Sequence, residues 1–194
     1  MKLSDIANFL FEVGMLKKTP RTGFQFLGSG RESVAEHITR TIFIGYTLCK
    51  LEGGVDELKV LKMCLFHDLP ETRTGDMNYV NKKYVTVDEN KAVKDLAETL
   101  FFGNDMEAAI SEFNEKKTKA SLLAHDADQL ALILQLKEYG DLGNKYSQEW
   151  IAYAIRRLCT DTAKKVAEAI LHTDSSDWWF KDKSDWWVNG RNGG

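Results

Sequence analysis

The chain has 194 residues, of which 43% are hydrophobic, and this is enough for one domain with a substantial core. Its formal net charge is −3, and it has no basic runs interleaved with aromatic residues, so a nucleic-acid polymer is not expected as a partner. No apolar run reaches the roughly 18 residues of a membrane span. The acidic N-terminal segment MKLSDIANFLFEVG differs from a signal peptide. A cytoplasmic protein without a membrane partner is expected.

Apolar residues recur at spacings of three and four along most of the chain, which is the period of an α-helix. Prolines occur only at Pro20 and Pro70. The expected helices cover residues 3–16, 33–51, 55–67, 88–102, 106–115, 118–139 and 145–171, with a short helical turn at Glu71. This pattern predicts an all-α fold, a single helical bundle.

Several helix ends carry recognisable signals. Ser33 can cap the helix over residues 33–51, and Glu36, three residues later, can complete a capping box. Pro70 disfavours helical geometry in the residue before it and ends the preceding helix, and Gly140 is the expected stop of the helix over 118–139. The first helix is expected to bury one stripe, formed by Ile6, Phe9, Leu10, Val13 and Leu16.

The predicted domain covers residues 1–172, and residues 173–194 form a tryptophan-rich tail. The tail repeats Ser-Asp-Trp-Trp at 176–179 and 184–187. These tryptophans are interpreted as docking residues for a neighbouring subunit, or as part of an extended tail, in preference to a surface that binds a nucleobase.

The three cysteines, Cys49, Cys64 and Cys159, are far apart in the sequence and lie in apolar helical patterns. No C-x-x-C spacing links them. Buried thiols are therefore predicted, in preference to disulfides or zinc ligands.

The stretch HDLPETRTGD concentrates groups that can bind a metal or move a proton. His67 and Asp68 end an apolar helix, and Glu71 follows at i+4 and i+3 from them, so the three side chains can share one side. Imidazole and carboxylate are ligands for divalent metals such as Mn, Fe, Co, Zn or Mg. A metal site is therefore expected at this helix end.

Two more residues extend this expectation to other helices. His37 lies one turn inside the capped helix over residues 33–51. Asp128 flanks an apolar stripe in AHDADQLALILQL, where an uncompensated carboxylate would be costly to bury. A metal would compensate this charge directly, and a nearby lysine or arginine is the alternative.

The order His37, then His67-Asp68, then Asp128 resembles the H…HD…D pattern of the HD-domain metal-dependent phosphohydrolases. Within that superfamily, LKKTPRTGF, ESVAEH, HDLPETRTGD and ADQLALILQ are similar to stretches of the YfbR-like 5′-deoxynucleotidases. The resemblance covers about residues 3–153 in the same order and leaves out the tail.

The resemblance implies an all-helical domain with one divalent metal ion held by His37, His67, Asp68 and Asp128. It also implies hydrolysis of deoxyribonucleoside 5′-monophosphates to deoxynucleoside and phosphate. Asp68 and Glu71 are the expected catalytic residues, with Glu71 as general base or as the group that orients water. Family members are commonly dimers, so a homodimer is expected.

Three further residues are expected to bind the substrate. Arg21 matches the arginine of the loop after the first helix, and Asp76 matches the aspartate of T-G-D, which is associated with the sugar or, together with Glu71, with a second divalent ion. Where the bacterial enzymes carry a tryptophan beside the arginine, this chain has Thr22, and Phe24 is the nearest aromatic residue. Base and sugar preference therefore stay open.

Other polar residues near these motifs are given ordinary roles. His125 could add a ligand, but a histidine bonded to a neighbouring acid is favoured, and Asp126 is expected to face solvent. Arg73 could bind phosphate, but a solvated arginine in a turn is at least as well supported. A diiron oxygenase is disfavoured because His125 is the only extra histidine between Asp68 and Asp128.

The sequence thus predicts a metal-dependent phosphomonoesterase with a small nucleotide substrate. Two alternatives are hydrolysis of another nucleotide or small phosphomonoester, and a nucleotide-sensing module that binds metal without turnover. The metal itself stays open among Mn, Co, Mg, Fe and Zn, because histidine and carboxylate ligands suit several of them.

Overall fold

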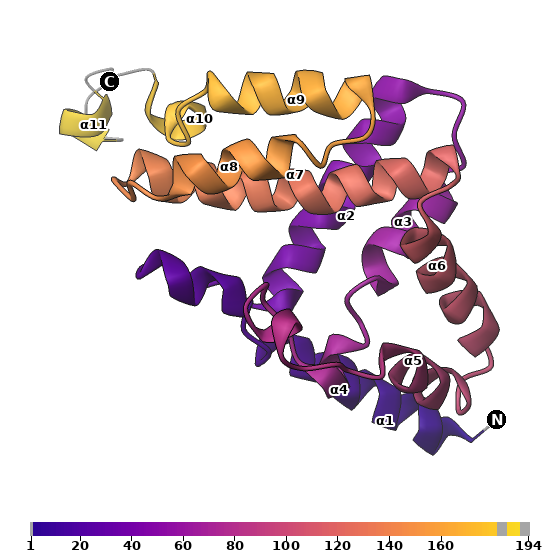
Figure 1. Ribbon diagram of the computed structural model, residues 1–194. Helices are drawn as coiled ribbons and strands as arrows, with labels where there is room; N and C mark the ends of the chain where they lie inside the picture. Colours follow the sequence, from indigo (N-terminus) through magenta and orange to yellow (C-terminus); the bar gives the residue numbers. More distant parts are fainter. Residues whose placement is uncertain (1, 182–185, 191–194) are drawn as a thin grey trace.

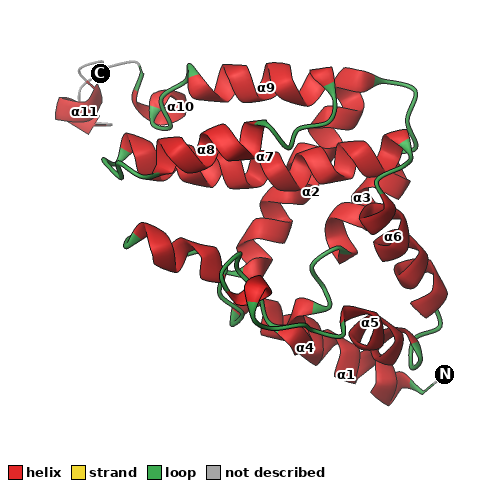
Figure 2. Ribbon diagram, in the orientation of Figure 1, coloured by secondary structure: helices red, strands yellow, loops and turns green. Residues whose placement is uncertain are grey.

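The computed structural model describes residues 2–181 and 186–190. Regular structure within these residues is helical, as expected for an all-α fold, apart from one isolated bridge between Pro20 and Ser33 (Figure 2). The α-helices are α1 (Leu3–Val13), α2 (Val34–Glu52), α3 (Glu57–Phe66), α4 (Glu71–Thr74), α5 (Glu89–Ala97), α6 (Gly103–Glu115), α7 (Lys119–Asp141), α8 (Ser147–Ile155), α9 (Asp161–Leu171), α10 (Asp177–Phe180) and α11 (Trp186–Asn189). Three 3-10 helices join them: η1 (Gly14–Lys17), η2 (Thr22–Leu27) and η3 (Asn81–Lys83).

The long helix α7 is the centre of the bundle and contacts α2, α3, α6, α8 and α9. Figure 1 shows α7, α8 and α9 side by side, with α2 crossing them. Helices α1, α4 and α5 lie together along the lower edge of Figure 1, where α5 contacts α4 and α6. Segments distant in sequence therefore meet around α2 and α7.

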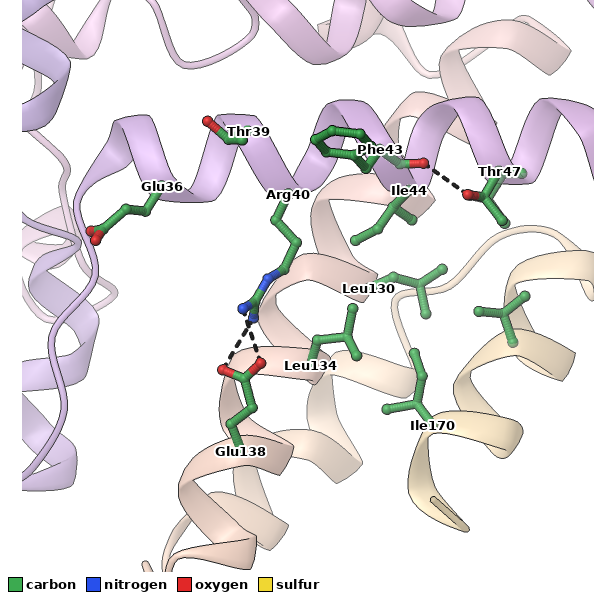
Figure 3. Close-up of a pocket in the computed structure, with 12 residues that line it drawn as sticks. Glu36, Thr39, Arg40, Phe43, Ile44, Thr47, Leu130, Leu134, Glu138 and Ile170 are labelled. Carbon is green, nitrogen blue, oxygen red and sulfur yellow. Dashed lines mark hydrogen bonds and ion pairs between the residues drawn. The ribbon is translucent and has the colours of Figure 1, made fainter. Parts of the chain in front are cut away.

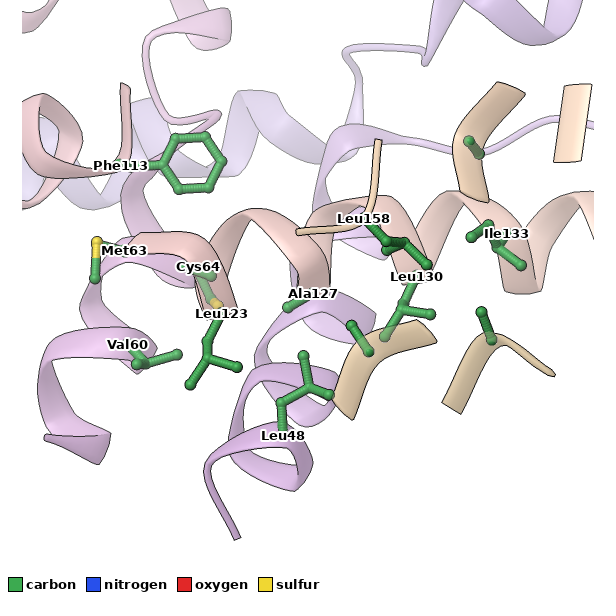
Figure 4. Packing of buried hydrophobic residues seen from close by; sticks show 14 of the residues in the cluster. Leu48, Val60, Met63, Cys64, Phe113, Leu123, Ala127, Leu130, Ile133 and Leu158 are labelled. Atoms are coloured by element: carbon green, nitrogen blue, oxygen red, sulfur yellow. The ribbon is translucent and has the colours of Figure 1, made fainter. Parts of the chain in front are cut away.

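Two apolar clusters hold the helices together. The first joins α2, α3 and α7 to α8 and α9, and its fully buried members include Leu48, Met63 and Leu130 (Figure 4). The second lies around the N-terminal half of α2 and includes Val34 and Met106. Because α2 contributes to both clusters, its middle turns are buried from several sides and keep a fixed position.

A glycine lets α2 and α3 approach closely. A Cβ at Gly45 would lie 2.7 Å from the Sγ of Cys64, too close for any other residue to fit without a shift. This close approach brings His37 on α2 toward the end of α3.

The expected capping box of α2 is confirmed, as are the end of α3 before Pro70 and the end of α6 at Glu115, whereas other helix boundaries differ. Ser33 and Glu36 form the capping box, with the Glu36 amide donating to Ser33 Oγ at 3.2 Å and the Ser33 amide donating to Glu36 Oε2 at 2.6 Å. The expected buried stripe of the first helix is wrong at Leu10, which is 63% exposed. The expected stop at Gly140 is wrong, because α7 continues through it to Asp141, and a Cβ at Gly140 would lie 2.7 Å from Ser147 Oγ.

The single helix expected over residues 145–171 is wrong, because the chain breaks between α8 and α9. Thr160 caps α9, and Asp126, expected to face solvent, is fully buried beside it. Asp126 accepts hydrogen bonds from the amides of Cys159 at 2.7 Å and Thr160 at 2.8 Å, and from Thr160 Oγ1 at 2.6 Å. A buried carboxylate thus satisfies the start of α9.

The cysteine prediction is confirmed for Cys49 and Cys64, which are free and buried, and is wrong for Cys159, which is free and exposed. The difference has the same origin as the broken helix: Cys159 lies in the short connection before α9 and not on a buried helical face.

Two short helices follow α9. Trp178 on α10 is 86% exposed, and the rings of Trp179 and Phe180 pack with that of Trp187 on α11. From the predicted second repeat, Ser184, Asp185 and the side chain of Trp186 lie outside the described residues, as do residues 191–194. Within residues 2–181 and 186–190, no helix is both long and apolar enough to cross a membrane.

Candidate metal centre and active site

The four predicted metal ligands come together from three helices. His37 lies in the first turns of α2, His67 and Asp68 follow the last residue of α3, and Asp128 lies midway along α7. His67 Nδ1 lies 2.9 Å from the carbonyl oxygen of Cys64, which makes it the donor to that carbonyl and directs Nε2 into the centre. Local helix-end geometry thus orients one of the ligands.

The ligand atoms are close enough to share one cation. One ligand atom each from His37, His67 and Asp128 lie within 4.8 Å of one another. His37 Nε2 is 3.0 Å from Asp128 Oδ1 and 3.6 Å from Asp68 Oδ2, and His67 Nε2 is 3.3 Å from Asp68 Oδ2. Asp68 therefore faces the same point as the other three residues.

The donor set fits a divalent metal. The Nε2 atoms of His37 and His67 are buried and lack a hydrogen bond of normal geometry among the described residues. Burial would raise the pKa of Asp68 and Asp128, but the two histidines and Arg21 outweigh it and hold both carboxyl groups ionised. Two imidazole nitrogens and two carboxylates around one point suit a borderline or hard divalent cation.

Arg21 reaches this centre from the loop before η2. Its Nη1 donates to Asp68 Oδ2 at 3.1 Å, and its Nε lies 3.9 Å from Glu32 Oε2. Its backbone amide donates to the carbonyl oxygen of Glu32 at 2.8 Å. The guanidinium is thus a fixed positive charge at the edge of the metal centre.

Glu71 is the first residue of α4 and its Oε2 is buried, with no hydrogen-bond partner among the described residues. Burial, followed by the charges of Asp68 and Asp76, raises the pKa of Glu71 to about 9. A cation bound beside it would oppose this rise, since positive charge favours the carboxylate. The group is therefore placed to hold or release a proton near the centre.

Asp76 holds the loop that carries Arg21. Asp76 Oδ2 accepts hydrogen bonds from the Thr22 amide at 2.5 Å and from Thr22 Oγ1 at 2.9 Å. Asn78 Nδ2 also donates to Thr22 Oγ1 at 3.1 Å. Gly75, with φ +71°, makes the turn that brings Asp76 back toward this loop. Thr22 therefore links the two loops.

Phe24 and Arg73 do not join the centre. Phe24 is 4% exposed and packs edge to face against Tyr139 at 5.5 Å, inside the first apolar cluster. Arg73 forms a two-pronged ion pair with Glu12, with Nε–Oε1 at 2.5 Å and Nη2–Oε2 at 2.9 Å. Phe24 is thus placed as a core residue, and Arg73 as a link from α4 to α1.

A series of hydrogen-bonded side chains that begins at Asp128 was not predicted from the sequence. Gln129 Nε2 donates to Asp128 Oδ2 at 2.7 Å, and Gln129 Oε1 accepts from Arg157 Nε at 2.6 Å. Arg157 Nη1 then donates to the hydroxyl of Tyr79 at 2.6 Å. The one sequence signal was Gln129 itself, a polar residue between Asp128 and the apolar run that follows it.

A second group of potential ligands, His125, Asp126 and Cys159, also has ligand atoms within 4.8 Å of one another. Both oxygens of Asp126 already accept hydrogen bonds from the start of α9. His125 is buried, contrary to the expected bond to an acid, and its Nδ1 has no partner among the described residues. Within this group, Asp126 is thus used to hold the start of α9.

A groove of about 640 Å³ lies elsewhere, between α2, α7 and α9 (Figure 3). Apolar side chains such as Phe43 and Leu134 line most of it, and the ion pair between Arg40 and Glu138 crosses one end. None of the four predicted metal ligands borders this groove.

Comparison with known proteins places this arrangement in a family. Residues 13–171 match the HD domain. The chain belongs to the HD-domain family. As in the predicted pattern, the residues of the HD pair, His67 and Asp68, lie at the centre of the site.

Named relatives of this HD domain are similar over most of its length. It is 32% identical over 149 residues to 5′-deoxynucleotidase HDDC2 of Dictyostelium discoideum, covering 71% of this chain and 78% of the relative. It is 29% identical over 148 residues to 5′-deoxynucleotidase HDDC2 of Homo sapiens, covering 72% and 71%.

A solved structure shares the fold of this HD domain. A conserved hypothetical protein from Pyrococcus furiosus superposes with a TM-score of 0.73 at 28% identity, covering 84% of this chain and 98% of the other. The fold is thus found along nearly the whole of that protein.

Proposed function

We propose that this protein hydrolyses deoxyribonucleoside 5′-monophosphates to a deoxynucleoside and phosphate. The observation that carries the proposal is the convergence of His37, His67, Asp68 and Asp128 on one point, with Arg21 beside them. The names of the relatives, 5′-deoxynucleotidase, support the class of substrate. Membership of the HD-domain family supports a hydrolase that uses a metal.

A divalent cation, one of Mn, Co, Mg, Fe or Zn, is the cofactor that these four residues would hold. When bound, such a cation lowers the pKa of water and offsets negative charge on a phosphoryl group. The tautomer of His67 is set by the Cys64 carbonyl, so that Nε2 is available as a ligand atom.

Arg21 is proposed to bind the phosphate. Its guanidinium is held between Asp68 and Glu32, so little side-chain freedom is lost when a phosphate binds. A planar guanidinium can donate two parallel hydrogen bonds to phosphate oxygens. Arg21 would thereby orient the ester bond relative to the metal centre.

Glu71 is proposed to move the proton. Its buried Oε2 has no other partner among the described residues, so it can accept a proton from attacking water or orient that water. The same carboxyl, once protonated, can pass the proton to the departing 5′-oxygen. Asp68 contributes to catalysis as the ligand that also anchors Arg21.

Asp76 is proposed to lie on the sugar side of the phosphate. Asp76 Oδ2 accepts the hydrogen bonds from Thr22, so Asp76 Oδ1 is the oxygen available to accept a hydrogen bond from a 3′-hydroxyl. Pairing with one hydroxyl in a closely held loop would favour deoxyribose over ribose. The alternative role of Asp76 is to hold a second divalent ion together with Glu71. In that case Asp76→Ala should lose activity equally on deoxyribonucleotides and ribonucleotides, and added metal should restore part of it.

The test is phosphate release by the purified protein with each candidate metal in turn. The substrates are matched deoxyribo- and ribonucleoside 5′-monophosphates and simple phosphomonoesters. Preferred release from the deoxyribonucleotides is expected. Preference for another phosphomonoester would favour the first alternative, and nucleotide binding without any release would favour the sensing module.

Three expectations remain predictions. Residues 1–172 should fold as the catalytic domain without the tail of residues 173–194, which can be measured by metal content and turnover of the shortened chain. The protein should be a homodimer, which sedimentation would measure. Its expected location in the cell is the cytoplasm.

A further inference from the structure

Phe24, the aromatic residue expected near the substrate, is buried in the core. Tyr79 is the alternative. It lies on the loop that follows α4, three residues after Asp76, and it is 70% exposed.

Tyr79 is exposed and yet held in place. Its hydroxyl accepts a hydrogen bond from Arg157 Nη1 at 2.6 Å, and the Arg157 guanidinium carbon lies 5.7 Å from the centre of its ring. An exposed ring that is already fixed loses little conformational freedom when a flat ligand packs on it.

The Tyr79 ring is connected to the metal centre by two routes. Through Arg157 and Gln129, three hydrogen bonds in series connect it to the ligand Asp128. Along the chain it is next to Asn78, which donates to Thr22 beside the phosphate residue Arg21.

We propose that Tyr79, held by Arg157, is the residue on which the nucleobase of the substrate stacks. The inference rests on the proposed function and extends it to base recognition. Since every base offers a flat π face, such a contact favours nucleotides over base-free sugar phosphates without selecting one base strongly. Arg157 acts through Tyr79 and is a positioning residue.

The experiment compares a deoxyribonucleoside 5′-monophosphate with 2-deoxyribose 5-phosphate, which has the same phosphate and sugar but no base. The variants are Tyr79→Ala and Tyr79→Phe, and the control is Tyr84→Ala, because Tyr84 is 83% exposed on the same connection. The readouts are kcat/KM for both substrates and the metal content of each variant.

The wild type should prefer the nucleotide, and Tyr79→Ala should reduce this preference by about tenfold, mainly through KM. Tyr79→Phe keeps the ring and should retain most of the preference, and Tyr84→Ala should match the wild type. Equal kcat/KM of the wild type for both substrates, or an unchanged ratio in Tyr79→Ala, would overturn the proposal. An equal loss on both substrates would also overturn it, because it would make Tyr79 a support for the loop of Asp76.

Binding to the metal-free protein separates this proposal from the proposed function. Calorimetric titration with the nucleotide should show weaker binding to Tyr79→Ala than to the wild type and to Tyr84→Ala. If the wild type releases no phosphate from any nucleotide, the proposed hydrolysis fails while this comparison still decides the stacking. Equal binding to Tyr79→Ala and the wild type would overturn the stacking itself.

Discussion

Single side chains at helix ends decide the chemistry of this site. His67 and His172 show how similar local geometry leads to different roles. Each follows the last residue of a helix with Nδ1 near a helical carbonyl oxygen, that of Cys64 at 2.9 Å and that of Glu168 at 2.8 Å. Only His67 is buried among carboxylates, whereas His172 is exposed. The surroundings of His67, not its local hydrogen bond, therefore distinguish it from His172 as a proposed metal ligand.

Removal of a ligand side chain should therefore abolish metal binding. His67→Ala and Asp68→Ala are each expected to lose bound metal and phosphatase activity, because each deletes one donor of the centre. Elemental analysis of the purified variants measures the metal, and phosphate release measures turnover. The matched control is His172→Ala, which should keep both. Full metal content in His67→Ala or Asp68→Ala would show that the proposed ligand set is wrong.

Glu71 should affect turnover and leave the metal in place. Glu71→Gln keeps the size of the side chain but cannot take up a proton, so kcat should fall by about 10² to 10⁴. Glu89→Gln is the control, because Glu89 is also the first residue of a helix but is exposed. Steady-state kinetics and metal content are the measurements. Wild-type turnover in Glu71→Gln would exclude Glu71 from the reaction.

At the scale of elements, α9 depends on a carboxylate from α7. Asp126 satisfies two backbone amides and one hydroxyl at the start of α9, over a sequence separation of 33 to 34 residues. This contact also explains why α8 and α9 are separate helices, since Cys159 and Thr160 turn their amides toward Asp126 instead of continuing a helix.

Loss of this cap should destabilise the protein. Asp126→Ala is expected to lower the free energy of unfolding by about 3 kcal/mol, because buried donors lose their partner at roughly 1–3 kcal/mol each. Urea unfolding followed by circular dichroism measures the change. Asp161→Ala, at the exposed first residue of α9, should cost less than about 1 kcal/mol. A similar loss in both variants would contradict the capping role of Asp126.

For the whole molecule, the fold buries Glu32 at a position where the ionised carboxylate lowers stability. Burial is the main cause that raises the pKa of Glu32 to about 7, with Glu36 and Glu138 adding to it and Arg21 and Arg40 opposing it. The folded protein therefore holds a proton on Glu32 between about pH 4.5 and pH 7 that the unfolded chain releases. The stability that the folded protein gains from protonated Glu32 is fully present below pH 4.5 and is lost as the pH rises to 7.

The stability advantage of Glu32→Gln should accordingly grow with pH. Relative to the wild type, its free energy of unfolding should rise by up to about 3 kcal/mol between pH 4.5 and pH 7.5, measured by urea unfolding with a chelator present. Glu149→Gln, on an exposed position of α8, controls for the loss of one negative charge. If the difference in free energy of unfolding between Glu32→Gln and the wild type does not change with pH, the raised pKa of Glu32 is refuted.

Much of this molecule follows from local pattern. The helical period, the capping box at Ser33 and the HD pair all act over a few residues, so the all-α fold, the start of α2 and the residues His67 and Asp68 can be identified from the sequence. The order of motifs along the chain was also sufficient to indicate the family.

Only the tertiary structure decided which distant polar groups meet. The burial of Asp126 and the chain from Asp128 through Gln129 to Arg157 and Tyr79 join residues tens of positions apart. Helical periodicity reports which side of a helix is apolar, but it does not report which loop packs against a given polar residue. Phe24 illustrates the same limit, because an aromatic residue in a loop can enter the core or face a ligand, and only the packing of α7 against η2 placed it in the core.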